Sequence, residues 1–204
     1  MSGTEVGRIL KDVITTRRSV RQFTETKVDV DRLASLVGLG MWAPTGGNAQ
    51  TWRFVIVTNE PTVRAIHAVS PGIGLPPPAI LAICQDRKRA EELGGAMGRD
   101  QCAPMDTAMA AQTIMLAAHA EGLGTCAVLS FHPGAVQKIL SLPEEVVPQL
   151  LITVGHPANV PPPPPRTSEG LIHLDRWGHP YTDKDPGPQR GSGARRDGKE
   201  GDGT

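Results

Sequence analysis

Aromatic residues and cysteines are scarce in this chain. Aromatic side chains make up 3% of its 204 residues, so aliphatic side chains must form most of any core. The three cysteines, Cys84, Cys102 and Cys126, are odd in number and widely spaced. This pattern argues against a disulfide framework and against a cysteine zinc site. It is typical of a reduced cytoplasmic protein whose thiols are structural.

The chain also lacks an excess of either charge and a long apolar run. Its 21 basic and 21 acidic side chains give a formal net charge of zero, which argues against a nucleic-acid partner. No apolar run approaches the roughly 20 residues needed to cross a bilayer. Residues 1–16 alternate apolar and charged side chains and lack the apolar core of a secretion signal. We therefore expect a cytoplasmic protein without a membrane partner.

The length and composition predict one folded domain followed by a tail. A hydrophobic fraction of 39% over 204 residues is enough for one core. Residues 184–204 contain six glycines, and Ala194 is their only apolar side chain apart from prolines. Such a segment cannot bury enough surface to order itself. We assign 1–182 to the folded domain and 183–204 to a disordered, glycine-rich tail.

Apolar spacing and turn residues predict alternating helices and strands. The helix expected at 104–121 is apolar nearly all round, which indicates a central position or a subunit interface. Residues 86–97 are highly charged and predict a short helix or a flap. Two further helices are expected at 5–16 and 61–69. Another should begin at a cap formed by Asp29 or Asp31, and a short helix should begin at His132 or Pro133. The expected strands are 52–58, 79–84, 125–129 and 149–155.

A cluster of arginines follows the first expected helix. Arg17, Arg18 and Arg21 surround Ser19. Arginine holds planar oxyanions through two parallel hydrogen bonds, so the cluster is a candidate phosphate clamp. The simpler alternative is that these side chains complement the negative end of the helix dipole.

A glycine-rich segment, residues 43–52, precedes the first expected strand. Its glycines let the backbone approach a ligand, while Asn48 and Gln50 each offer a donor and an acceptor. That combination suits a heteroaromatic ring. An ordinary glycine-rich turn is the alternative.

Other site types find little support. Residues 122–127 match the spacing of a dinucleotide-binding motif, but a helix precedes them and a strand follows, which is the reverse of that motif's context. We interpret the glycines as a helix end and a tight turn. His156, His173 and His179 lack cysteine or carboxylate partners at ligand spacing, so we expect no metal site.

Taken in order, four blocks of the sequence resemble the FMN-dependent nitroreductase family. They are residues 17–23, residues 43–54, the alanine-rich helix that runs into 122–124, and 155–157 with the following proline run that ends at Arg166. Each block is weak alone, but their order and spacing over roughly residues 9–175 are specific.

The resemblance implies an α+β fold, a three-layer sandwich with a mixed, mainly antiparallel sheet flanked by helices. It also implies a homodimer in which each subunit embraces the other, with an arm at 166–182 packed on the partner. FMN would lie between the subunits, held by residues toward the phosphate and ribityl chain, the ring, and flavin N5. The implied cofactor-binding residues are Arg17, Arg18, Ser19, Arg21, Pro44, Thr45, Gly46, Asn48, Gln50, Leu129, Ser130 and Arg166.

Within that set, Arg17, Arg18, Ser19 and Arg166 are expected near the phosphate and ribityl chain, and Arg21 near the ring. Pro44, Thr45, Gly46 and Asn48 would line the ring from the other subunit. The backbone amide of Ser130, next to Leu129, would face N5. No side chain is assigned as a nucleophile, because FMN carries the chemistry.

The implied activity transfers electrons from NADH or NADPH through FMN to a nitroaromatic, quinone or similar acceptor, with ping-pong kinetics. A dedicated metabolic flavoenzyme of the same fold is the main alternative: a reductive dehalogenase, a deazaflavin reductase, a cyclic-dipeptide oxidase or a flavin-cleaving enzyme.

Thr51 replaces a proline common in the family, and Leu129 and Ser130 replace an acidic residue and glycine found in some members. A binding module that uses the proline run 161–165 is a third reading.

Overall fold

The computed structural model describes residues 2–181. Their contacts divide into two units at Pro163 and Pro164, and each unit is treated separately below. The tail predicted over 183–204 lies outside the described residues.

A four-stranded sheet forms the centre of the first unit. Its strand order is β2 (Trp52–Val57), β3 (Ala79–Asp86), β5 (Val146–Gly155) and β4 (Gly124–Val128), and each neighbouring pair is antiparallel. β3 is buried along almost its whole length, as its continuous apolar run predicts. One parallel bridge joins Ser19 to Thr125 at the outer edge of β4.

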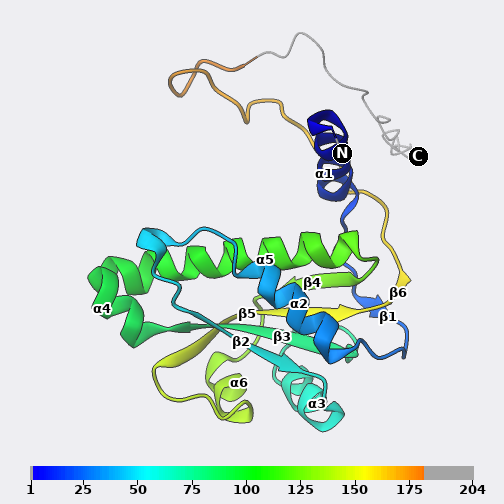
Figure 1. Cartoon of the computed structure of the whole chain (residues 1–204), viewed down its shortest axis with the longest axis vertical. Helices are drawn as coiled ribbons and strands as arrows, with labels where there is room; N and C mark the ends of the chain where they lie inside the picture. Colours follow the sequence, from blue (N-terminus) through cyan, green and yellow to red (C-terminus); the bar gives the residue numbers. More distant parts are fainter. Residues whose placement is uncertain (1, 182–204) are drawn as a thin grey trace, which may run out of the picture. The chain divides into compact units, whose positions relative to one another are not determined.

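Helices cover both faces of this sheet (Figure 1). α2 (Val30–Gly40) and α5 (Ala103–Ala120) lie over one face, and α3 (Glu60–Ala68) and α6 (Pro133–Ile139) lie over the other. The two buried apolar clusters correspond to these two layers. The predicted α+β sandwich with helices on both faces is therefore confirmed.

α5 is the central helix, as its composition predicts. Its small residues allow close packing, and α2 approaches it at Gly40, where an added Cβ would lie 2.5 Å from Ile114 Cγ1. Arg32 of α2 also donates hydrogen bonds to Glu121, just beyond the end of α5. Packing and polar contacts thus fix the two helices side by side on the sheet.

α4 (Arg87–Met97) occupies the charged segment for which a helix or a flap was expected. Gly95 interrupts it with φ of +58°, and a π-helical turn, Gly98–Cys102, joins it to α5. The sequence did not predict this turn, since a π-helix has no distinctive periodicity over five residues. The turn ends at Cys102, directly before the first residue of α5.

α1 (Gly3–Thr16) has no buried residue. Its apolar face, formed by Val6, Ile9, Leu10 and Ile14, is largely exposed. The helix therefore has an apolar stripe with no cover in the described chain. No helix in residues 2–181 is long and apolar enough to cross a membrane.

Two short strands were not predicted from the sequence. β1 (Gln22–Phe23) pairs with β6 (Pro157–Asn159), and both are too short to show an alternating pattern. β5 also begins earlier than expected, because a register shift opposite Ile83 and Cys84 accommodates Pro148 within the ladder.

The second unit, as far as it is described, contains a small turn near its end. Leu174 N donates to His179 O and Tyr181 N donates to Ile172 O, both at 2.8 Å. The ring of Trp177 lies against His173, yet Trp177 remains 85% exposed. The packing of this segment on a partner stays a prediction.

Candidate functional site

The arginine cluster, Arg17, Arg18 and Arg21, lies along the outer edge of β4. Val20 N donates to Thr125 O at 2.9 Å, which ties the segment to the strand. An added Cβ on Gly124 would lie 2.7 Å from Val20 Cγ1, so the glycine permits this close approach. The edge of the sheet thus fixes the backbone that carries the arginines.

No carboxylate in residues 2–181 forms an ion pair with this cluster. Arg18 Nη1 donates to the backbone oxygens of Thr15 and Arg17 at 2.8 Å, and Arg21 Nη1 donates weakly to Ser19 O at 3.4 Å. Arg18 therefore does complement the end of α1, as the simpler reading proposed. The positive charge of the cluster nevertheless remains uncompensated by any described acid, which suits an anionic ligand.

A cavity of about 170 Å³ adjoins the cluster. Its walls include Arg17, Arg18, His119 and Thr125, and the Thr125 hydroxyl is buried without a hydrogen-bond partner in the described chain. His119 Nε2 lies 2.8 Å from Thr16 Oγ1. Desolvation, then the charges of Arg17 and Arg18, lower the pKa of His119, so its ring is neutral at physiological pH. A buried hydroxyl without a described partner and two arginines in the same wall form a set of donors that suits a phosphate.

Leu129 and Ser130 lie just beyond the other end of β4. Leu129 is 72% exposed, and Ser130 O accepts a hydrogen bond from Gly72 N at 2.9 Å. The backbone N–H of Ser130 has no acceptor among the described residues. One strand edge therefore presents the arginines near its start and a free amide after its end.

The glycine-rich segment forms a strained turn, here called the 44–50 loop. Gly47, Asn48 and Gln50 all have left-handed backbone angles, with φ of +57°, +56° and +50°. Thr45 Oγ1 accepts a hydrogen bond from Gln50 N at 3.3 Å, and Gln50 Nε2 donates to Asn48 Oδ1 at 2.8 Å. The two amides that were expected to face a ring therefore bind each other here, while Pro44, Asn48 and Gln50 remain exposed.

Two residues behind this loop were missed by sequence reasoning. Asp106 Oδ1 accepts a hydrogen bond from Gly46 N at 3.1 Å, and the side chain of Cys102 lies against Gly46. Burial raises the pKa of Asp106, and the hydrogen bond from Gly46 partly offsets this effect. The sequence feature that could have identified Asp106 is its position as an acidic residue inside a helix that is apolar nearly all round.

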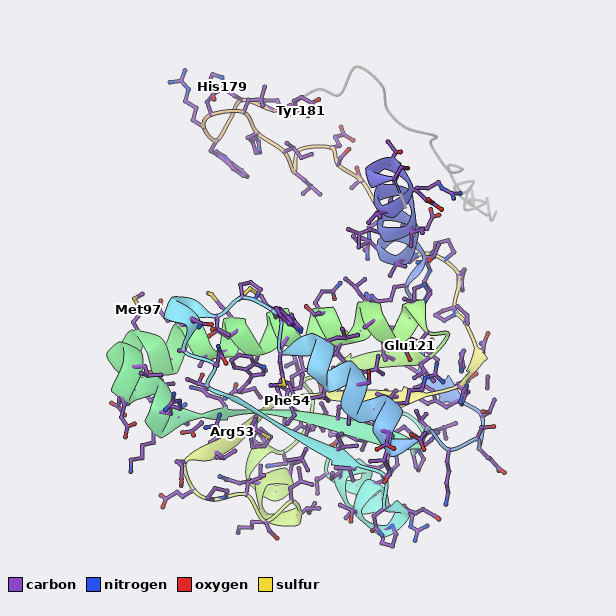
Figure 2. All side chains as sticks on the ribbon, in the orientation of Figure 1. Arg53, Phe54, Met97, Glu121, His179 and Tyr181 are labelled. Carbon is purple, nitrogen blue, oxygen red and sulfur yellow. The ribbon has the colours of Figure 1, made fainter. Side chains whose placement is uncertain are left out.

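The predicted site residues form two separate groups within the first unit. The 44–50 loop contacts the start of α5, whereas the arginine cluster lies beside His119 near the end of that helix. Asp106 and His119 are 13 residues apart, which is about 20 Å of helix. Figure 2 labels Met97, the last residue of α4 before the π-helical turn that leads into α5, and Glu121, just past the other end of α5. Arg166 belongs to the second unit, and its part in the clamp stays a prediction.

Comparison with known proteins connects this arrangement to one family. The Nitroreductase family model matches residues 14–73 and 70–156. The chain is 30% identical over 164 residues to 5,6-dimethylbenzimidazole synthase of Rhodobacter capsulatus, covering 67% of this chain and 77% of that protein. It is 24% identical over 190 residues to FMN reductase (NADPH) of Bacillus subtilis, covering 84% and 75%.

Solved structures share the fold of this chain. The structure of NfrA2 from B. megaterium superposes with a TM-score of 0.76 at 24% identity, covering 84% of this chain and 76% of that one. Since the family model spans well over half of the sequence, the chain belongs to the nitroreductase family and is an oxidoreductase.

Proposed function

We propose that this protein is an FMN-dependent oxidoreductase that passes electrons from NADH or NADPH to a nitroaromatic, quinone or similar electron-poor acceptor. The observation that carries the proposal is the edge of β4, where an arginine cluster without acidic partners in residues 2–181 and the Ser130 amide lie along one strand. The name of the B. subtilis relative, FMN reductase (NADPH), supports the same assignment.

Bound FMN would supply the redox chemistry, and the chain would supply binding and orientation. Arg17, Arg18 and Ser19 would hold the phosphate and ribityl chain, with the Thr125 hydroxyl as a further polar group at that end. Arg21 would place positive charge near the ring. The Ser130 N–H would donate a hydrogen bond to N5. Because one cleft would receive both donor and acceptor, we expect ping-pong kinetics with parallel initial-rate lines.

The separation of the two groups of residues favours a homodimer. The 44–50 loop contacts α5 near its start and the arginine cluster lies near its end, about 20 Å further along the helix, so one chain does not bring the two groups together. A second copy, related by twofold symmetry, would bring its 44–50 loop to the first copy's arginines. Trp42, next to that loop and 87% exposed, and Met105 on α5 supply apolar surface for such an interface.

The arm would add to the same assembly. We propose that residues 166–182 pack on the partner and that Arg166 completes the phosphate clamp. Leu171, Leu174 and Trp177 are exposed apolar side chains in this segment, which suits packing against another surface.

A double substitution tests the proposed phosphate clamp. We expect Arg17→Ala with Arg18→Ala to yield protein without bound FMN, because removing two charge-assisted contacts weakens binding at least about 100-fold. FMN content and titration of the apoprotein measure this. Arg8→Ala with Lys11→Ala removes equal charge from α1 and serves as the control. Full FMN content with a loss of only about 0.3–1 kcal/mol of stability per residue would support the helix-dipole role instead.

A dedicated metabolic flavoenzyme is the second candidate, favoured by the 30% identity to a 5,6-dimethylbenzimidazole synthase. Stopped-flow mixing of the FMN-loaded protein with NADH and NADPH separates the two. Rapid loss of flavin absorbance supports the proposed reductase. Slow loss with both nucleotides supports the dedicated enzyme.

A further inference from the structure

We propose that Asp106 is a positioning residue that holds the 44–50 loop in the shape needed to contact the flavin. This inference rests on the proposed function, because it assigns a purpose to the loop within the FMN site. Asp106 would not touch the flavin or the substrate. It would act through Gly46, from the buried side of the loop.

The first observation is the burial of Asp106. Its residue is only 3% exposed, and it lies in a helix whose neighbouring buried side chains are mostly apolar. No cation in residues 2–181 pairs with it. An unpaired carboxylate is costly to bury, so packing alone would favour an apolar residue here.

The second observation is the target of its hydrogen bond. Asp106 Oδ1 accepts from Gly46 N at 3.1 Å, across 60 residues of sequence. Thr107, the adjacent buried polar residue, donates instead to Ala103 O within its own helix. Of these two neighbours, only Asp106 is directed to the loop.

The third observation is the strained backbone of the 44–50 loop, which must be held in place by contacts outside the loop. Asn48 and Gln50 adopt left-handed angles, which cost a residue with a side chain roughly 1 kcal/mol each or more. The hydrogen bonds within the loop come from exposed residues. Among the hydrogen bonds of the loop within residues 2–181, the bond to Asp106 is the one that reaches a buried side chain.

The geometry of Gly46 makes this bond possible. An added Cβ would lie 3.2 Å from Cys102 Cβ and 3.4 Å from Cys102 Sγ, so the loop backbone rests directly on the start of α5. That start is fixed by the sheet. Gln85, fully buried on β3, donates to Arg99 O in the π-helical turn and accepts from Gln149 Nε2 of β5 at 3.0 Å. Polar contacts thus run from the sheet to the π-helical turn, and from α5 to the loop.

Three variants of the full chain test the proposal. Asp106→Ala removes the acceptor, Asp106→Asn keeps an acceptor without charge, and Thr107→Val removes a buried hydroxyl that does not reach the loop. Hydrogen–deuterium exchange of a peptide covering residues 44–50 reports on the loop without any ligand. Titration of the apoprotein with FMN measures the affinity of the proposed site for FMN.

We expect Asp106→Ala to accelerate loop exchange and weaken FMN binding by about tenfold each, since one buried hydrogen bond is lost. Asp106→Asn should fall between Asp106→Ala and the wild type, because a neutral acceptor is weaker than a charged one. Its melting temperature at pH 7 should exceed that of the wild type, because no charge is buried in the variant. Thr107→Val should match the wild type in both loop exchange and FMN affinity. Stability and binding would thus change in opposite directions for Asp106→Asn, which a purely structural role does not explain.

The inference fails if loop exchange is unchanged in Asp106→Ala, or if Asp106→Ala and Thr107→Val have equal effects. Unchanged FMN affinity in Asp106→Ala would also overturn it, provided that the wild type binds FMN. If the wild type binds no FMN, the proposed function fails, and the exchange experiment still decides whether Asp106 anchors the loop.

Discussion

At the scale of single residues, Asp106 links stability to pH. Its folded pKa is raised by burial, so the native state binds this proton more tightly than the unfolded state does. The stability that it contributes is complete below the unfolded pKa of about 4 and is lost as pH rises through the folded pKa.

We therefore predict that Asp106→Asn becomes more stable than the wild type as pH increases from about 4 toward neutrality. Urea unfolding at a series of pH values measures the difference in free energy. Thr107→Val should show a difference that does not depend on pH. A constant difference for Asp106→Asn would mean that the carboxyl group has an ordinary pKa in the folded protein.

Local chemistry made several residues predictable. Asp29, one of the two caps expected there, caps α2, and the glycines at 122–124 follow the end of α5. Asp106 was not predicted, because its partner lies 60 residues away in the sequence. The mutual hydrogen bond of Asn48 and Gln50 was also missed, since it depends on backbone angles that their residue types permit but do not require.

At the scale of elements, the contact between α2 and α5 depends on one glycine. An added Cβ at Gly40 would lie 2.5 Å from Ile114 Cγ1, whereas one at Gly38 would meet nothing within 4 Å. We predict that Gly40→Ala destabilises the protein by about 1–3 kcal/mol through overpacking. Gly38→Ala should instead stabilise it by up to about 1 kcal/mol through helix propensity. Urea unfolding of both variants measures this contrast, and equal effects would contradict the packing.

Elements with strong periodicity were predictable, while short or irregular ones were not. The core helices and strands contain enough residues for their apolar spacing to show. β1, β6 and the π-helical turn contain too few residues for a pattern, and their geometry is set by tertiary contacts. The start of β5 was missed because Pro148 argues against a strand unless a register shift accommodates it.

At the scale of the whole molecule, the order of the sequence blocks identified the family and the fold, because family members share that order. The sequence did not show how the site residues are distributed over the fold. That the 44–50 loop and the arginine cluster lie at opposite ends of α5 follows from how the sheet and helices pack. This separation is the structural reason for proposing that two copies build each FMN site.

Subunit complementation tests that central claim most directly. Arg17→Ala with Arg18→Ala disables the cluster. Asn48→Gly with Gln50→Gly removes the loop amides while keeping residues that tolerate left-handed angles. Differently tagged copies of the two variants are co-expressed, purified through both tags, and assayed for bound FMN. Each variant expressed alone is the control and should bind almost none.

If each site combines one copy's arginines with the other copy's loop, the mixed dimer has one intact site and one doubly defective site. The account then predicts about half of the wild-type FMN content in the purified mixed dimer. A mixed dimer without FMN would contradict the shared site.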